Sequence, residues 1–387
     1  MLYQNTPVNI IGLDMSSAFD TIDRAELMSI LENIVDEDEQ RMCRLLLSDT
    51  TMKMRFDNHD EETFQTNKGS PQGDAISGTF FNIAFENALR DLRSILNQDK
   101  IMIEHSYCKP TDICNLPDEL IYADDSDFPC TDDHKVNKIK DIANPTLSKH
   151  SLTVNEDKWE ITKVCRGNEI DEKAWRNTKK LGSLLGDNED MKNRIALAKG
   201  LINQLEKLWP SKQVCQKQRI KIFQSIAKMI LTYNMSTWGL TKAQEDELNR
   251  AHRKMLRTVV GDRRMRNKLL YEHCNEKVLS SEMREARWRA FGHMLRLDRR
   301  VPAQKAMDYY FNVPLNAKKF SGRRRATLPV CIDNDLKDAA KHTQLPVQQF
   351  LNRQDLEKLR SLATDRVAWR ALSKQIIMHK DQGNFQI

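Results

Sequence analysis

Two adjacent carboxylates stand between apolar residues in the stretch ELIYADDSDF, residues 119–128. Acidic residues between β-forming flanks are typical of a hairpin tip, so the stretch predicts a β-hairpin with Asp124 and Asp125 at its turn. A second stretch, VNIIGLD at residues 8–14, is apolar and ends at a third carboxylate, Asp14. We expect it to form a buried strand. Because a sheet can join strand ends that are far apart in the sequence, we expect the three carboxylates to meet.

Clustered carboxylates repel one another unless cations are bound. Their oxygen atoms suit Mg²⁺, which shares its remaining positions with water and substrate phosphates. Two such ions can activate an attacking hydroxyl and stabilise a leaving pyrophosphate. An Asp-Asp pair by itself is more often a turn or a helix cap than a metal site, so the surrounding residues decide between these interpretations.

Strand and helix patterns alternate in the first half of the chain, and the second half is mainly helical. The sequence predicts two helices over 24–47, a hairpin over 52–64, a glycine-rich turn at 68–74 that leads into a helix, a helix at 135–149, a strand at 152–155 and a hairpin at 179–186. Amphipathic helices are predicted at 195–208, 219–233, 244–260 and 356–377. The pattern indicates an α+β fold followed by all-α regions.

Three motifs occur in a fixed order: LDMSSAFD at 13–20, GSPQGD at 69–74 and YADD at 122–125. They resemble motifs A, B and C of a reverse transcriptase. The segments VNEDK at 154–158 and KLGSLL at 180–185 are similar to motifs D and E. The resemblance narrows to non-LTR (LINE-like) retrotransposon proteins through TWGLT at 237–241, AFGHMLR at 290–296 and DRVAWR at 365–370.

The resemblance implies a right-hand polymerase. Its palm would be an antiparallel sheet with helices, followed by an all-α thumb and a basic, mainly helical C-terminal domain. The palm is expected at 1–190, the thumb at 191–260 and the C-terminal nucleic-acid-binding region at 261–387. Since motif A begins at Leu13, the resemblance also implies an N-terminal truncation, with the endonuclease and most of the fingers missing.

The same resemblance assigns catalytic roles. Asp14, Asp124 and Asp125 would hold two Mg²⁺ ions, with Mn²⁺ as a substitute, and the backbone carbonyl of Met15 would be a further ligand. Lys158 is similar to the motif D lysine that protonates the leaving pyrophosphate or binds the triphosphate.

Residues near the carboxylates would select the substrate. Phe19 falls where an aromatic ring would clash with a 2′-hydroxyl, so the expected substrates are deoxynucleoside triphosphates. Ordinary core packing is the alternative role for this ring. Gln72 and Gly73 would contact the template–primer or the nucleotide, because glycine lets a backbone approach closely. Asp20 and Asp23 are expected to cap the following helix.

The implied function is RNA-directed DNA synthesis. Such an enzyme adds deoxynucleotides to the 3′-hydroxyl of a primer on an RNA template, and its expected partners are an RNA template and a DNA primer or target. The alternative is a decayed or co-opted remnant that only binds nucleic acid. The presence of all three metal-site aspartates favours the enzyme, whereas the expected absence of the fingers favours the remnant.

Charge is unevenly distributed along the chain. Residues 1–190 hold 21 Lys and Arg against 37 Asp and Glu, a net −16, and the remainder holds 40 against 18, a net +22. The basic half favours a polyanion partner, although two oppositely charged solvated faces would give the same counts. Its candidate nucleic-acid contacts are Arg219, Lys221, Arg253, Arg257, Arg287 and Arg289. Any single one also fits a solvated helix face, and Trp288 fits a helix-bundle core better than a base-stacking platform.

The eight cysteines show no pairing rhythm and no CxxC motif, which indicates a reducing compartment. The start MLYQNTPVNI lacks the pattern of a signal peptide, so we expect a cytoplasmic and nuclear location. No apolar run approaches the roughly 18 residues of a transmembrane helix, and no membrane partner is expected.

Overall fold

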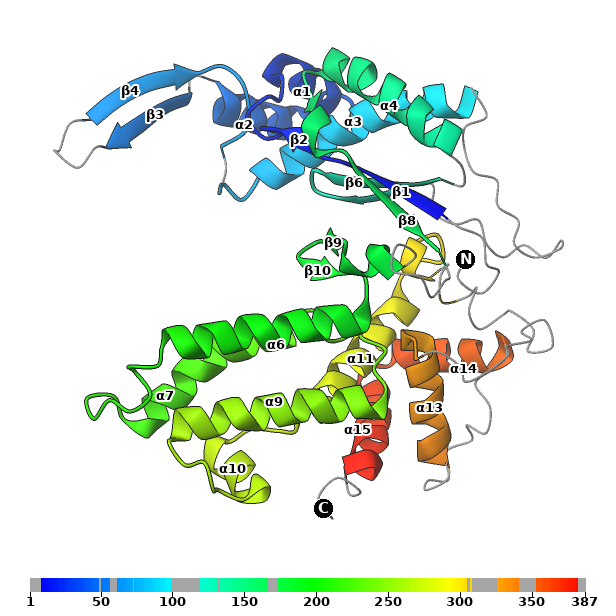
Figure 1. Cartoon of the computed structure of the whole chain (residues 1–387). Coiled ribbons are helices and arrows are strands. Elements are labelled where there is room, and N and C mark those ends of the chain that lie inside the picture. The colour runs from blue at the N-terminus through cyan, green and yellow to red at the C-terminus, as the bar shows by residue number, and fades with distance from the viewer. Residues whose placement is uncertain are drawn as a thin grey trace. The chain divides into compact units, whose positions relative to one another are not determined.

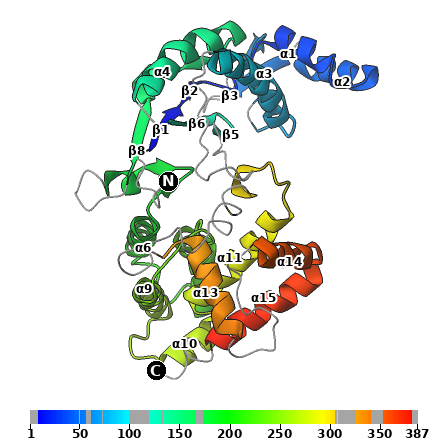
Figure 2. The ribbon, with the colours of Figure 1, turned by 90° about the vertical axis from the view of Figure 1, so that its right-hand side faces the viewer.

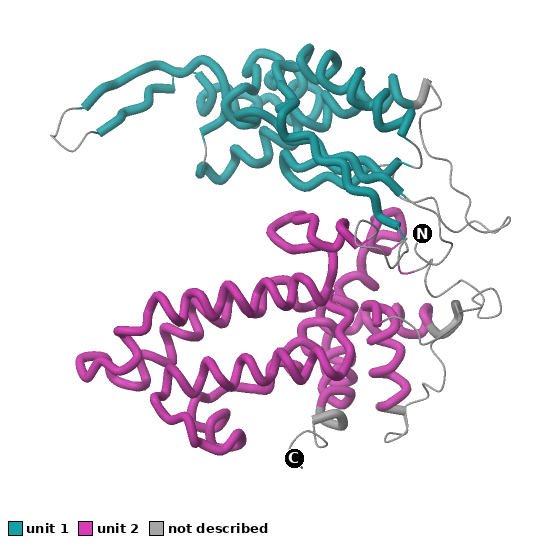
Figure 3. Tube along the Cα trace, viewed as in Figure 1, with its two compact units in different colours: residues 1–105, 116–168 teal, residues 106–115, 169–387 magenta. Residues whose placement is uncertain are grey.

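The computed structural model of the chain divides into two compact units (Figure 3). Unit 1 comprises Met1–His105 and Leu116–Asn168, and unit 2 comprises Ser106–Asn115 and Glu169–Ile387. The division therefore precedes residue 190, where the sequence suggested the end of the palm. The structure describes residues 8–48, 50–55, 61–71, 73–98, 119–130, 133–165, 173–304, 307, 326–340 and 353–381.

A four-stranded antiparallel sheet forms the centre of unit 1 (Figure 1). In the order β5-β6-β1-β8 its strands are β5 (Leu120–Tyr122), β6 (Asp125–Cys130), β1 (Val8–Leu13) and β8 (Glu160–Val164). β1 is hydrogen-bonded on both sides and almost completely buried. Its continuous apolar sequence is typical of such a central strand.

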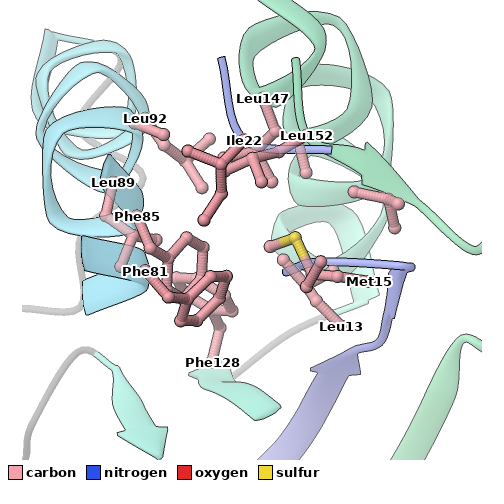
Figure 4. Packing of buried hydrophobic residues seen from close by; sticks show 14 of the residues in the cluster. Leu13, Met15, Ile22, Phe81, Phe85, Leu89, Leu92, Phe128, Leu147 and Leu152 are labelled. Carbon is pink, nitrogen blue, oxygen red and sulfur yellow. The ribbon is translucent and has the colours of Figure 1, made fainter. Parts of the chain in front are cut away.

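Helices lie against the sheet of unit 1 and supply most of its apolar core (Figures 1 and 2). Figure 4 shows Phe81 and Phe85 from one of these helices gathered with Leu13 from β1 and Phe128 from β6. The helices are α1 (Arg24–Leu31), α2 (Glu37–Leu47), α3 (Ser77–Gln98) and α4 (Asp133–Leu147).

Acidic side chains determine where two helices begin. Asp23 is the N-cap of α1, because its carboxylate accepts hydrogen bonds from the backbone nitrogens of Ala25 and Glu26. Asp36 and Glu39 form a capping box at α2. The acidic run DEDE at residues 36–39, which interrupts the apolar pattern of residues 24–47, therefore marks the start of α2. The predicted helix cap is confirmed at Asp23. Asp20 lies three residues before this cap and is not the N-cap of α1.

Short strands complete unit 1. The predicted hairpin is confirmed as β3 (Thr50–Arg55) and β4 (Glu61–Thr66), whose residues are mostly exposed. β2 (Met15–Ser16) pairs with β7 (Thr153–Val154). The 3₁₀ turns η1 (Ser148–His150) and η2 (Glu156–Lys158) stand on either side of β7.

Unit 2 is mainly helical (Figure 2). It opens with the 3₁₀ turn η3 (Ala174–Asn177) and the small hairpin of β9 (Lys179–Lys180) and β10 (Ser183–Leu184). The helices that follow are α6 (Asp187–Gln204), α7 (Gln216–Ile222), α8 (Lys228–Thr232), α9 (Lys242–Val260), α10 (Asn267–Cys274), α11 (Leu279–Arg296), α13 (Leu328–Ala340), α14 (Arg353–Thr364) and α15 (Arg366–Asp381).

A π-helical turn, η4 (Phe223–Ala227), divides the helix predicted at 219–233. The periodicity predicts that Phe223, Ile226 and Leu231 all face the core. Phe223 and Leu231 are buried, but Ile226 is 44% exposed. The prediction for Ile226 is wrong because the wider π turn changes the angular spacing of its side chains.

The last helices of unit 2 pack around aromatic rings. Trp288 is fully buried, and its ring lies 5.7 Å from Phe291 and 5.6 Å from Trp369. The preference for a core role for Trp288 is confirmed. The indole nitrogen of Trp369 donates a hydrogen bond to the carbonyl of Trp288 at 3.0 Å, which ties α15 to α11.

The fold class predicted from the sequence is confirmed. The chain combines a palm of antiparallel sheet and helices with an all-α thumb and a mainly helical C-terminal region. Among the described helices, none has the length and apolar character needed to cross a membrane.

Candidate active site

The sheet register brings Asp14 level with the β5–β6 hairpin. Leu13 pairs with Ser126 in the antiparallel ladder between β1 and β6. One residue further along both strands, Asp14 falls opposite Asp125. Two acidic residues that are far apart in the sequence therefore follow the same end of the β1–β6 ladder.

The hairpin turn adds the third carboxylate. Tyr122 pairs with Asp125, which leaves Ala123 and Asp124 as the two turn residues. Ala123 has φ +53°, a left-handed conformation that costs a residue with a Cβ about 1–2 kcal/mol. Such strain is often found at functional turns. The strained residue, Ala123, directly precedes Asp124 at the tip of the hairpin.

Lys158 lies at the same end of the sheet. Its Nζ donates a hydrogen bond to Asp14 Oδ2 at 2.8 Å. Asn155 holds the preceding segment in place by donating its backbone N–H to the carbonyl of Asp14 at 2.8 Å. The pKa of Lys158 is raised first by the hydrogen bond that its Nζ donates to Asp14, then by the charge of Asp14, with a smaller contribution from Asp124. Nζ therefore stays protonated at neutral pH.

The carboxylate oxygens suit a divalent cation, and the Lys158 ammonium group shows that this position already attracts positive charge. Within the part of the chain that the structure describes, no three His, Cys, Asp or Glu side chains form a group that could hold a metal ion. The donor chemistry fits Mg²⁺, whereas the side chains as they stand do not form a three-ligand cluster.

The glycine-rich turn docks onto the segment that follows Asp14. The backbone nitrogens of Gly69 and Ser70 donate to the carbonyls of Ile22 and Phe19, each at 2.9 Å. Gly69 has φ +75°, and a Cβ there would lie 2.8 Å from backbone atoms of Asp20. Only glycine fits this approach. Motifs A and B are therefore joined by backbone hydrogen bonds.

Phe19 is half-buried, and its ring stacks on Phe81 of α3 with centroids 4.6 Å apart. This contact supports the core-packing role, and the contact with a sugar remains a prediction. Gly73 has φ +95° and open space around it, as a backbone meant for close approach would need. Gln72 lies outside the described residues.

Arg24 holds these segments together, a role that was not predicted from the sequence. Its buried guanidinium donates to the carbonyls of Gly69 at 2.8 Å, Leu47 at 2.8 Å and Thr66 at 2.7 Å. It also reaches the carbonyl of Lys68 at 3.1 Å. One side chain thus joins α1 and α2 to the hairpin base and the glycine-rich turn. The available signal was an arginine in the first turn of a helix, where the macrodipole disfavours positive charge.

Arg287 does not lie on a nucleic-acid-binding surface. Its side chain is 1% exposed, and it donates to the carbonyl of Trp238 at 3.0 Å and to Asp335 Oδ2 at 3.4 Å. The prediction of a phosphate contact is wrong for this residue, because its charge is buried against an internal carboxylate.

The other five predicted phosphate contacts lie in unit 2 with different exposures. Lys221 and Arg289 are exposed. Two of the remaining arginines already bond within the unit: Arg219 to the carbonyl of Trp209, and Arg257 to the carbonyl of Met265 at 3.0 Å. Arg253 is half-buried. Nothing in the described residues tests whether any of them contacts nucleic acid.

Unit 1 thus combines acidic residues at one end of an antiparallel sheet with a docked glycine-rich turn. Residues 4–191 match the family model of "Reverse transcriptase (RNA-dependent DNA polymerase)". These residues of the chain are therefore similar to a reverse-transcriptase domain. No curated protein matches the chain.

Solved structures with local similarity include telomerases of two yeasts. A telomerase from Candida tropicalis truncated from its C-terminal domain shows 18% identity and a TM-score of 0.34 over 42% of this chain and 32% of that chain. Telomerase from Candida albicans in complex with a telomeric RNA fragment shows 10% identity and a TM-score of 0.32 over 74% and 48%. The C. tropicalis telomerase with such a fragment shows 13% identity and a TM-score of 0.33 over 80% and 50%. The chain spans between about a third and a half of these proteins.

Proposed function

We propose that this chain is an RNA-directed DNA polymerase of the non-LTR retrotransposon kind. The observation that carries the proposal is the register in which Leu13 pairs with Ser126 and Tyr122 pairs with Asp125, at the strand ends next to Asp14 and Asp124. The reverse-transcriptase match over residues 4–191 gives the class of reaction. The segments 237–241, 290–296 and 365–370 support the non-LTR subtype by their resemblance.

Asp14, Asp124 and Asp125, with the carbonyl of Met15, are the residues that would hold two Mg²⁺ ions. When bound, these ions would activate the primer 3′-hydroxyl and stabilise the leaving pyrophosphate. Lys158 contributes a proton held on Nζ, close to the carboxylates. That position suits it to neutralise or protonate the departing pyrophosphate.

The partially buried ring of Phe19 supports the choice of sugar. Stacking on Phe81 of α3 holds the ring of this motif A residue in place. A fixed ring excludes a 2′-hydroxyl better than a mobile side chain, so deoxynucleoside triphosphates are the proposed substrates. The proposed partners are an RNA template and a DNA primer or target, and the proposed location is cytoplasmic and nuclear.

Primer extension tests the polymerase. The chain is given an RNA template, an annealed DNA primer, Mg²⁺ and deoxynucleoside triphosphates, and is compared with Asp124→Asn. We expect extension by the unmutated chain and a loss of about 100-fold or more in the variant, a typical cost of removing charge stabilisation from a reaction centre.

Asp141→Asn is the matched control. It removes the same charge from an exposed position on helix α4 rather than from the hairpin, and should extend primers normally. If the unmutated chain binds the primer–template but does not extend it, the polymerase proposal is overturned in favour of a remnant that only binds nucleic acid.

A further inference from the structure

A groove with a volume of about 1210 Å³ lies between α11 and α15 of unit 2. The two helices pack directly against each other (Figures 1 and 2). Ala286 and Ala290 of α11 and the buried Trp369 of α15 are among its lining residues. The small alanine side chains leave room above the contact between the helices.

Six cations line this groove, and five of them lie on α11 and α15. Arg289 and Arg296 come from α11, and Arg366, Arg370 and Lys374 come from α15. The three on α15 are spaced by four residues, which puts them on one helix face about 6 Å apart along the axis. Like charges at this spacing destabilise a helix, so the row has no evident role in folding.

The carboxylates of the groove are already paired. Glu276 is buried and accepts a hydrogen bond from Lys228 Nζ at 2.5 Å, and Glu285 is paired with Lys277 at 2.6 Å. They therefore leave the cations of the opposite helix without compensation.

Among the described residues, Arg289, Arg366, Arg370 and Lys374 form no ion pair with a carboxylate, and the three on α15 are exposed. Arg296 donates to the carbonyl of Ala363 at 3.0 Å, a neutral acceptor that leaves its charge uncompensated.

The arginines just beyond α11 behave differently. Arg299 is paired with Glu357 at 2.8 Å, and Arg300 with Asp298 at 2.9 Å. Unpaired cations are thus concentrated in the groove, although paired arginines stand a few residues away.

We propose that this groove binds the phosphodiester backbone of a nucleic-acid strand. A row of cations along two helices matches a linear polyanion with regularly spaced charges, whereas a small anion would satisfy only one or two of them. Four of the five cations are arginines, whose planar guanidinium groups bond phosphate oxygens in pairs. The proposal takes its class of ligand from the proposed function but does not depend on polymerisation.

Binding by the full chain tests the groove. The probes are a fluorescein-labelled oligouridine and the matching oligothymidine, without nucleoside triphosphates, over about 50 to 200 mM salt. Arg366→Ala/Arg370→Ala should weaken binding about tenfold or more. It should also reduce the slope of log K against log salt by about 0.7 for each lost phosphate contact.

Arg299→Ala/Arg300→Ala is the matched control, since it removes the same charge from exposed, paired arginines. It should change binding less than about twofold, because surface ion pairs contribute little. Arg366→Lys/Arg370→Lys keeps the charge and should retain part of the affinity. Thermal unfolding of each variant should match that of the parent, since the substituted side chains are exposed.

Weaker binding of the RNA probe, the DNA probe or both supports the groove and identifies the strand it prefers. Unchanged binding of both probes, or an equal loss in the control, overturns the proposal. Displacement of the probes by polyglutamate as effectively as by unlabelled nucleic acid also overturns it and points to an acidic protein. Asp124→Asn should bind like the parent, so a failure of polymerisation is distinguishable from a failure of the groove.

Discussion

Arg24 shows how one side chain can fix the geometry of a site without touching a substrate. Its guanidinium bonds four carbonyls, those of Leu47, Thr66, Lys68 and Gly69. A lysine has a single ammonium group and cannot reach all of these acceptors at once. Arg24 is therefore a positioning residue that holds the glycine-rich turn against motif A.

Arg24→Met should lower the free energy of unfolding of unit 1 by about 3 kcal/mol or more, because buried carbonyls lose their partners. Urea denaturation monitored by the fluorescence of Trp159, the tryptophan of unit 1, measures the change. Arg41→Met is the control, since Arg41 is exposed on α2, and it should change stability by less than about 0.5 kcal/mol. Equal effects of the two substitutions would show that the Arg24 bonds carry no stability.

At the scale of elements, α11 and α15 pack closely because α11 has a glycine at the contact. A Cβ on Gly292 would overlap the indole of Trp369. Gly200 in α6 is the opposite case, with no atom within 4 Å of the position of a Cβ. Glycine in the middle of a helix is unfavourable, so its presence at position 292 reflects the packing of the aromatic core.

Gly292→Ala should destabilise unit 2 by about 1–3 kcal/mol through overpacking against Trp369. Gly200→Ala should instead stabilise it by up to about 1 kcal/mol, because alanine favours a helix and nothing obstructs its methyl group. Chemical denaturation of both variants measures the difference in sign. Stabilisation by both substitutions would contradict the close packing of α11 on α15.

At the scale of the whole molecule, the two units contain histidines with opposite responses to pH. Burial alone would lower the pKa of His150, but hydrogen bonds to Glu26 at 2.5 Å and Asp91 at 3.0 Å outweigh burial and raise the pKa above 6.5. His252 of unit 2 is fully buried. Burial first, then the charges of Lys228 and Arg253, lowers its pKa to about 3.

His150 stabilises unit 1 below pH 6.5, and this contribution is lost as the pH rises through its raised pKa. His252 has the reverse effect. The stability of unit 2 that depends on neutral His252 is present above pH 6.5 and is lost as the pH falls towards 3, by about 2 kcal/mol at pH 5.

Urea denaturation between pH 8 and pH 5 tests both histidines. His150→Gln should remove the stabilisation of unit 1 on acidification. His252→Phe should remove the loss in unit 2, since neither ring nitrogen of His252 has a hydrogen-bond partner in the described structure. Identical pH profiles for parent and variants would contradict the assigned pKa directions.

Local patterns predicted much of the molecule. The apolar stretch 8–13, the acidic hairpin tip and the amphipathic helices each reflect the period of one element, and the structure contains them. The approach of Asp14 to the hairpin was also expected, because a sheet can join strand ends that are far apart in the sequence. The internal roles of Arg24 and Arg287 were missed, because their acceptors are many residues away in the sequence.

The sequence by itself determined the α+β class, the order of the elements and the resemblance to a reverse transcriptase, because hydrophobic periodicity and short motifs are local properties of a chain. Only the tertiary structure decided which charged side chains are buried or paired and which are available to bind a partner. It buried Arg287 against Asp335, paired Arg299 and Arg300 with carboxylates, and left Arg366 and Arg370 unpaired beside a groove. The sequence does not specify this, because burial and pairing depend on residues that become neighbours only when distant segments pack together.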